Sequence, residues 1–126
     1  MAGLVGCYWH RYPDLARTHV EVLTDYSRKL DELVRSGAEL RPENLTELRY
    51  PYERARDFAR IVRDRFSSTE SFARFEAFLD RYAELLAAAE RVRSGGAAAD
   101  DAVAPLVRRL EADGEGVIEA LAVESR

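Results

Sequence analysis

The stretch from Ser67 to Gly96 constrains the fold of this chain more than any other segment. Its large apolar residues recur at alternating steps of three and four, which keeps them on one face of an α-helix. A second apolar series recurs every seven residues beside the first, so the stripe has the width expected of a helix in a bundle. The first series is Phe72, Phe75, Leu79, Tyr82, Leu86 and Ala89, and the second is Phe78, Leu85 and Val92.

Both ends of this segment carry signals that begin or end a helix. Ser67 and Glu70 have the spacing of a capping box, in which each side chain accepts a hydrogen bond from a backbone amide near the helix start. Gly95 and Gly96 follow the last apolar position, and glycine commonly ends helices because it adopts left-handed backbone angles. We therefore expect one helix over 67–94, whose apolar face the rest of the chain must cover.

Three other segments show the same helical periodicity and are expected to supply that cover. The first spans 13–36 and is followed by Gly37, a favourable residue after a helix end. The second spans 51–66, and Pro51 starts or kinks it, because proline suits the first position of a helix and disrupts an interior one. The third spans 100–124.

The remaining segments are expected to interrupt this pattern. The last helix should kink or split over 113–116, because the sequence Asp-Gly-Glu-Gly is a poor helix interior. Residues 37–50 are expected to form a connection, since Pro42 and Asn44 break the apolar period, although 43–49 could form a short helical turn. Residues 1–12 are expected to fold back on the bundle through their large aromatic side chains, which are Tyr8, Trp9 and Tyr12.

These expectations define an all-α fold, an antiparallel four-helix bundle with a packed N-terminal segment and a kinked or split last helix. The 126 residues are enough for one domain with its own core. The short junction between the helices at 51–66 and 67–94 favours antiparallel neighbours. The apolar face of the helix at 67–94 is also wide enough to pair with a second copy, so a homodimer is an alternative.

The composition favours a cytoplasmic protein. Cys7 is the only cysteine, so the chain has no internal disulfide and no cysteine-rich metal site. No apolar run reaches the ~18–20 residues of a membrane span. The first residues lack the basic start of a secretory signal.

A row of arginines is the sharpest functional signal. Three of them follow steps of four and three along one face of the helix expected over 51–66. Such a row binds phosphates, or an acidic protein groove, through charge and paired hydrogen bonds. Alternatively, the arginines pair with acids of their own helix or of neighbouring helices. The row is Arg49, Arg56, Arg60 and Arg63, and Arg49 belongs to it only if the helix continues through Pro51.

A second candidate site lies in the expected core. His19 and three tyrosines occupy positions on the apolar seams of their helices. Together they could line a small polar pocket for a ligand, as helical bundles often provide. The alternative is a core histidine that is hydrogen-bonded to a tyrosine. The tyrosines are Tyr26, Tyr52 and Tyr82.

The sequence lacks the patterns of common catalytic and metal sites. Cys7, His10 and His19 do not match a zinc-binding spacing. The Glu-x-x-His motif of di-metal bundles is absent, and so are nucleophile motifs and glycine-rich phosphate loops. We expect no catalytic residue, no metal and no cofactor.

Three functions remain, in decreasing order of support. The first is a non-enzymatic adaptor or assembly subunit that acts through protein contacts. The second is a small nucleic-acid-binding subunit that uses the arginine row, against which the net charge of −4 weighs. The third is a carrier that holds a small molecule in the core near His19.

Overall fold

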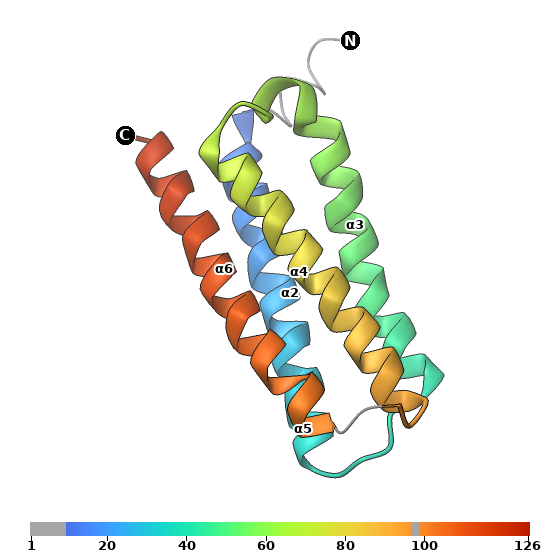
Figure 1. Ribbon diagram of the computed structural model, residues 1–126. Helices are drawn as coiled ribbons and strands as arrows, with labels where there is room; N and C mark the ends of the chain where they lie inside the picture. Colours follow the sequence, from blue (N-terminus) through green and yellow to red (C-terminus); the bar gives the residue numbers. More distant parts are fainter. Residues whose placement is uncertain (1–9, 97–98) are drawn as a thin grey trace.

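The computed structural model describes residues 10–96 and 99–126, and within these ranges the chain is helical and contains no strand. Four long helices lie side by side, and a short helical turn, α5, precedes the last of them (Figure 1). This result confirms the all-α class. The helices are α2 (Tyr12–Arg35), α3 (Pro42–Phe66), α4 (Glu70–Arg93), α5 (Ala99–Ala102) and α6 (Ala104–Glu124).

The helices form a ring in which α3 and α6 lie on opposite sides (Figure 1). α4 and α2 each contact both of them, and the contact between α4 and α6 is the most extensive in the molecule. The start of α4 lies beside the end of α6, since the backbone amide of Ser71 donates to the Glu124 carboxylate over 2.8 Å. Further along, Arg81 of α4 bonds Asp113 of α6 over 3.0 Å.

The core is centred on α4, as the width of its apolar stripe predicts. Phe72, Phe75, Phe78 and Tyr82 are all buried. Because an aromatic side chain buries a large apolar area, this helix contributes much of the hydrophobic stabilisation of the fold. The other helices cover it with smaller buried residues, including Ala16, Val20, Leu23, Leu30, Ala55, Val62, Val107, Leu110, Val117 and Leu121.

The expected start of the second helix is wrong. α3 begins at Pro42 and passes through Pro51 without a break. Asn44 reaches back to accept a hydrogen bond from the backbone amide of Arg41 over 2.8 Å, so Pro42 and Asn44 begin a helix instead of breaking one. Buried Leu45 and Leu48 lie in this added part and extend the apolar face of α3.

Two further sequence expectations differ from the structure. The cap of α4 is Thr69, whose hydroxyl accepts the amide of Phe72 over 3.2 Å, so the box from Ser67 to Glu70 is not used. α6 is one continuous helix across 113–116, and the expected split is absent. Packing explains why the helix continues here, because Gly114 is buried where α6 approaches α2 and α4 closely.

The structure describes only part of the segment 1–12, which is expected to pack on the bundle. Residues 1–9, with Cys7, Tyr8 and Trp9, lie outside the described residues. Tyr12 belongs to α2 and is 2% exposed, and its ring stacks on Phe66 at 3.9 Å between centroids. Tyr12 is therefore a core residue of the first long helix.

Candidate functional site

The four arginines of the row lie on one flank of α3, because the helix is continuous through Pro51. Arg56 donates to Asp80 of α4 over 2.6 Å and to the hydroxyl of Tyr52 over 2.8 Å. Burial disfavours the charge of Arg56, but these hydrogen bonds outweigh it and leave its pKa raised. Arg63 donates to Glu76 of α4 over 2.7 Å.

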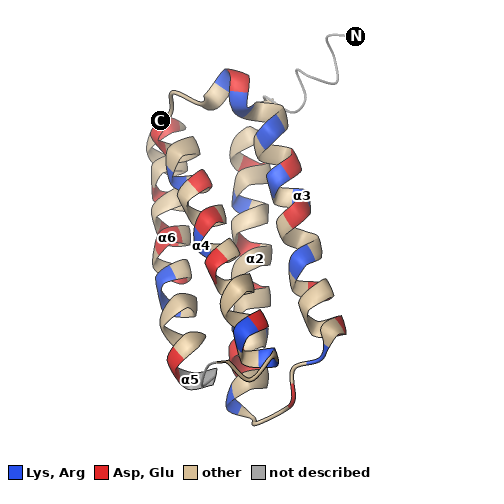
Figure 2. Ribbon diagram, turned by 45° about the vertical axis from the view of Figure 1, so that its right-hand side comes forward, with Lys and Arg blue, Asp and Glu red and all other residues tan. Residues whose placement is uncertain are grey.

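The other two arginines of the row also lie near acidic side chains, one on the same helix and one on α4. Arg60 pairs with Asp57 on its own helix over 3.1 Å. Arg49 lies near enough to Glu90 of α4 for its charge to help lower the pKa of that carboxyl, after the larger effect of the hydrogen bond from Arg93. Opposite charges thus face each other along the seam between α3 and α4, and Figure 2 shows both signs along these helices. Much of the positive charge of the row is balanced within the molecule.

The tyrosines of the predicted pocket form a packed contact between α3 and α4. The rings of Tyr52 and Tyr82 stack at 5.7 Å between centroids. Tyr82 is fully buried and donates to the carbonyl of Leu48 over 2.8 Å. Leu48 lies in the turn before Pro51, whose missing amide leaves the neighbouring carbonyl of Glu47 without its helical donor. Burial, followed by the proximity of Tyr26, raises the pKa of Tyr82, so its hydroxyl stays protonated and donates.

His19 takes a separate place, where α2 faces α3 and α4. Its ring lies 4.9 Å from that of Phe58 and 6.5 Å from that of Phe75. Burial lowers the pKa of His19, and the positive charge of Arg54 lowers it further. The structure therefore surrounds His19 with phenylalanines, whereas the sequence analysis grouped it with the tyrosines.

Tyr26 lines a groove between α2 and α3 with a volume of about 170 Å³. Lys29 lies over its ring at 5.2 Å from the centroid. His19, Tyr52 and Tyr82 are not among the residues that line this groove. His19 thus contacts phenylalanines, whereas Tyr26 lies near enough to Tyr82 to affect its pKa, and the pocket expected from the four residues together stays a prediction.

A buried polar cluster at the other end of the bundle was missed by the sequence analysis. Tyr12 of α2 and Ser71 of α4 share a hydrogen bond of 2.8 Å between their hydroxyls. The Ser71 hydroxyl also donates to Glu124 of α6 over 2.6 Å. We call Tyr12, Ser71 and Glu124 the polar clasp, because it joins three helices. Its signal was a serine on the apolar stripe of α4, four residues before Phe75.

Three exposed apolar side chains lie along the side of the molecule where α2 meets α3. Val22, Tyr50 and Ile61 are 36%, 60% and 52% exposed. Tyr50 and Ile61 share one flank of α3 with Arg54, whose charge acts on His19 of α2. Val22 follows His19 by three positions on α2. We call Val22, Tyr50 and Ile61 the α2–α3 face.

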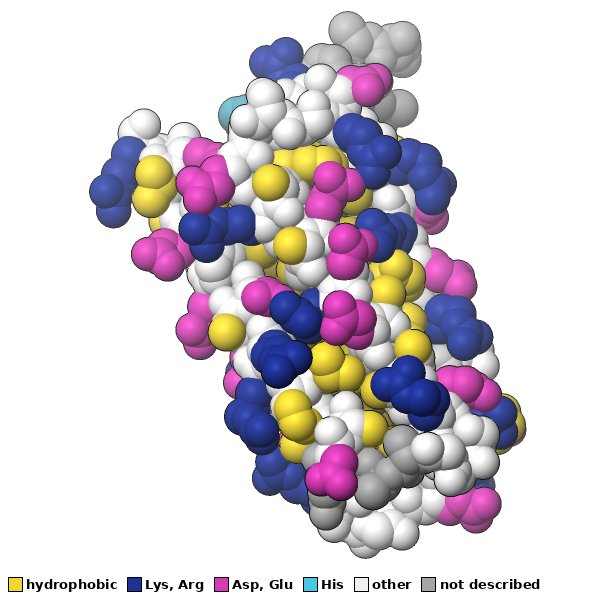
Figure 3. All heavy atoms as spheres, viewed as in Figure 1, with side chains coloured by type: hydrophobic (Ala, Val, Ile, Leu, Met, Phe, Trp, Pro, Cys, Tyr) yellow, Lys and Arg dark blue, Asp and Glu magenta, His cyan; other side chains and the backbone are white. Residues whose placement is uncertain are grey.

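The face of the molecule over α4 has a different character. Figure 3 shows basic and acidic side chains interspersed there, with small apolar patches between them. No helix of the described chain is both long enough and apolar enough to cross a membrane. Residues 10–96 and 99–126 hold no group of three side chains suited to binding a metal, and Cys7 lies outside them.

Comparison with known proteins adds no family. The sequence matches no protein-family model, and no curated protein and no solved structure is significantly similar to it. Its function must therefore be argued from its own residues.

Proposed function

We propose that this protein is a non-enzymatic adaptor or assembly subunit, an antiparallel four-helix bundle that binds a partner protein through the α2–α3 face. The observation that carries the proposal is the position of the exposed apolar side chains. Three of the four large ones among the described residues belong to this face. Protein interfaces bury an apolar centre inside a polar rim, and charged groups such as Lys29, Glu47 and Arg54 supply a rim here.

The arginine row supports this order of hypotheses. Arg56 and Arg63 hold carboxylates of α4. A phosphate would have to displace those partners, and the net charge of −4 opposes approach to a nucleic acid. The proposal includes a cytoplasmic location, which the single cysteine favours.

The proposal is tested by photo-crosslinking from two matched positions. A photoreactive phenylalanine analogue replaces Ile61, which is 52% exposed, or Val123 of α6, which is 56% exposed. We expect a discrete crosslinked product in cells from position 61 and none from position 123. A Tyr50→Asp change should remove that product, because it places a charge in the apolar centre.

The crosslinked product also identifies the partner. A product of twice the mass of the chain would make the partner a second copy, and mass spectrometry would identify a different protein. Identical products from positions 61 and 123, or no product from either, would contradict the proposal.

The nucleic-acid alternative has its own test in fluorescence anisotropy with labelled single-stranded RNA and double-stranded DNA. The comparison is between the wild type and a variant with Arg56→Glu, Arg60→Glu and Arg63→Glu. We expect no binding at physiological salt. Binding that persists there, weakens steeply as salt rises and is lost in the variant would replace the adaptor proposal.

A further inference from the structure

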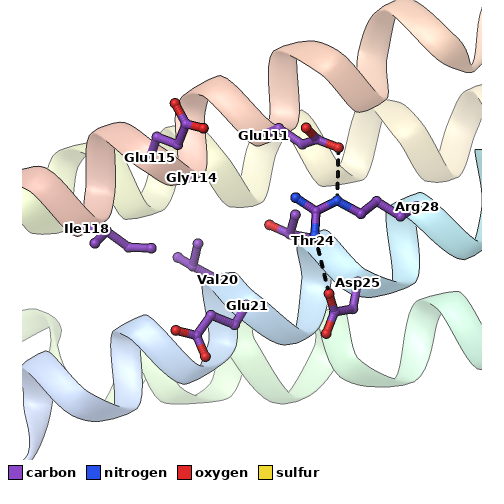
Figure 4. A pocket seen from close by; sticks show the side chains of 9 residues that line it. All are labelled: Val20, Glu21, Thr24, Asp25, Arg28, Glu111, Gly114, Glu115 and Ile118. Carbon is purple, nitrogen blue, oxygen red and sulfur yellow. Dashed lines mark hydrogen bonds and ion pairs between the residues drawn. The ribbon is translucent and has the colours of Figure 1, made fainter.

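A groove of about 360 Å³ runs between α2 and α6, on the side of α2 away from the α2–α3 face. Figure 4 shows Val20 and Ile118 between its two walls. Val20 is 2% exposed and Ile118 is partly buried, so the floor is apolar and continuous with the core. An apolar floor of this kind favours an apolar side chain of a bound segment over water.

Gly114 lets the two walls approach each other. A Cβ atom at this position would lie 3.0 Å from Cγ1 of Val20 and 3.1 Å from Cε1 of Phe78. Since glycine has no side chain, α6 packs directly on α2 and α4 at this level. The groove is therefore shallow and firmly supported, which suits a docking surface better than an enclosed ligand cavity.

The walls of the groove are acidic, and among the described residues their negative charges are paired with a cation at one end only. Arg28 bonds Glu111 across the groove over 3.1 Å and Asp25 on its own helix over 3.6 Å. Figure 4 shows these groups at one end of the groove. At the other end, Glu21 of α2 and Glu115 of α6 lie on opposite walls, and neither has an ion-pair partner within the described part of the chain.

The other helix seams show what is missing here. Asp80, Glu76 and Asp113 each face a neighbouring helix, and each accepts a hydrogen bond from an arginine of that helix. Within the groove, Glu111 is paired in the same way. Glu21 and Glu115 also belong to two neighbouring helices, but both are exposed and their carboxylates point away from each other at the outer edges of the two walls (Figure 4). A cationic group of a partner would complement either carboxylate.

We propose that this groove docks an arginine-bearing amphipathic helical segment of a partner protein. An apolar side chain of that segment rests on Val20 and Ile118, and arginines one turn away on either side pair with Glu21 or with Glu115. Arginine fits better than lysine because its planar guanidinium donates two parallel hydrogen bonds to one carboxylate. The inference rests on the proposed adaptor function and gives the adaptor a second surface, distinct from the α2–α3 face.

The test uses a labelled synthetic peptide of roughly 18 residues, about five helical turns, with arginine and leucine one turn apart. Its binding is measured by fluorescence anisotropy at about 0.15 M salt. The groove variant carries Glu21→Gln and Glu115→Gln. The matched control carries Glu39→Gln and Glu53→Gln, which are exposed, lie outside the groove and change the net charge equally.

The groove variant should bind the peptide about 3- to 10-fold more weakly than the wild type, because two exposed charge pairs are lost. The control should stay within about 2-fold of the wild type, since long-range attraction is largely screened at this salt. A peptide with glutamate in place of arginine should not bind. No binding by the wild type, or an equal loss in both variants, would overturn the inference.

The two proposals fail in different experiments. Loss of the crosslink at position 61 concerns the α2–α3 face alone. Failure of peptide binding, with the crosslink at position 61 intact, removes the groove and leaves the adaptor function standing.

Discussion

The contact between α4 and α6 and the contact between α2 and α3 are built differently. α4 and α6 pack along their length, with buried Gly114 at the closest approach and the Arg81–Asp113 pair and the polar clasp along the seam. α2 and α3 make a smaller contact through half-buried residues such as His19 and Tyr26. Apolar side chains of Tyr50 and Ile61 remain exposed beside it.

This difference separates stability from recognition. The seam between α4 and α6, which packs at a buried glycine and is joined by hydrogen bonds between the two helices, serves mainly the fold. A seam that leaves Tyr50 and Ile61 exposed costs hydrophobic stabilisation, which binding of a partner can restore. Substitutions in the first seam should therefore unfold the protein, whereas those at the α2–α3 face should leave its stability nearly unchanged.

The largest effect is expected at Gly114. A Gly114→Val change adds side-chain carbons where a Cβ alone would lie 3.0 Å from Val20 and 3.1 Å from Phe78. We expect the free energy of unfolding, measured by urea denaturation, to fall by about 3 kcal/mol because the core is overpacked. Ala112→Val, at an exposed site on α6, is the control and should cost less than about 1 kcal/mol. Equal losses in both variants would mean that this seam is not closely packed.

The next largest effect is expected at the polar clasp. Ser71→Ala removes the hydroxyl partner of buried Tyr12 and one of the two donors to Glu124. The unfolding free energy should fall by about 2 kcal/mol, since a buried polar group loses its partner. Ser125→Ala, which removes only a hydroxyl bonded within α6, should change it by less than about 0.5 kcal/mol. A loss in Ser71→Ala as small as in this control would show that the clasp does not hold the helices together.

Local spacing predicts the helices well because the apolar period is a property of neighbouring residues. The left-handed glycines after α2 and α4, Gly37 at φ +77° and Gly95 at φ +80°, follow from the same local logic. Pro51 could not be predicted in this way. Its place inside α3 depends on its burial in the core, which tertiary packing decides.

The candidate site shows the same limit. The spacing of Arg56 and Arg63 predicts that they share a flank of a helix, but it does not say which helix that flank faces. Spacing does not identify their partners, Asp80 and Glu76, because the neighbour of a helix is decided by tertiary packing. Ser71 carried a local signal, a small polar residue on an apolar stripe, and that signal predicts a buried hydrogen bond.

A smaller effect should appear in the pH dependence of stability. Burial and Arg54 lower the pKa of His19 below its ordinary value of 6.5 in the folded protein. As pH falls below about 6.5, His19 of the unfolded chain takes up a proton before His19 of the folded protein does. The free energy of unfolding therefore decreases between pH 6.5 and the lower pKa of the folded state, and this histidine does not affect it above pH 6.5. The urea midpoint should fall more between about pH 8 and about pH 5.5 in the wild type than in His19→Gln.

The matched control for this measurement is His10→Gln, which changes an exposed histidine. It should keep the pH dependence of the wild type. If His19→Gln behaved like the wild type too, His19 would be solvated, and the α2–α3 contact would be more open than the structure shows.

The smallest effect is expected for the ion pair that joins α3 to α4, on the side of α3 away from its exposed flank. Arg56 and Asp80, whose side chains are 29% and 69% exposed, join α3 to α4. A double-mutant cycle with Arg56→Gln and Asp80→Asn should give a coupling of about 0.5–1 kcal/mol. The same cycle for Arg60 and Asp57, both on α3 and more exposed as a pair, should give about 0.3 kcal/mol or less. If the two couplings were equal, the α3–α4 pair would add no anchoring beyond that of an ordinary surface pair. The exposed flank of α3 would then depend on apolar packing alone for its position.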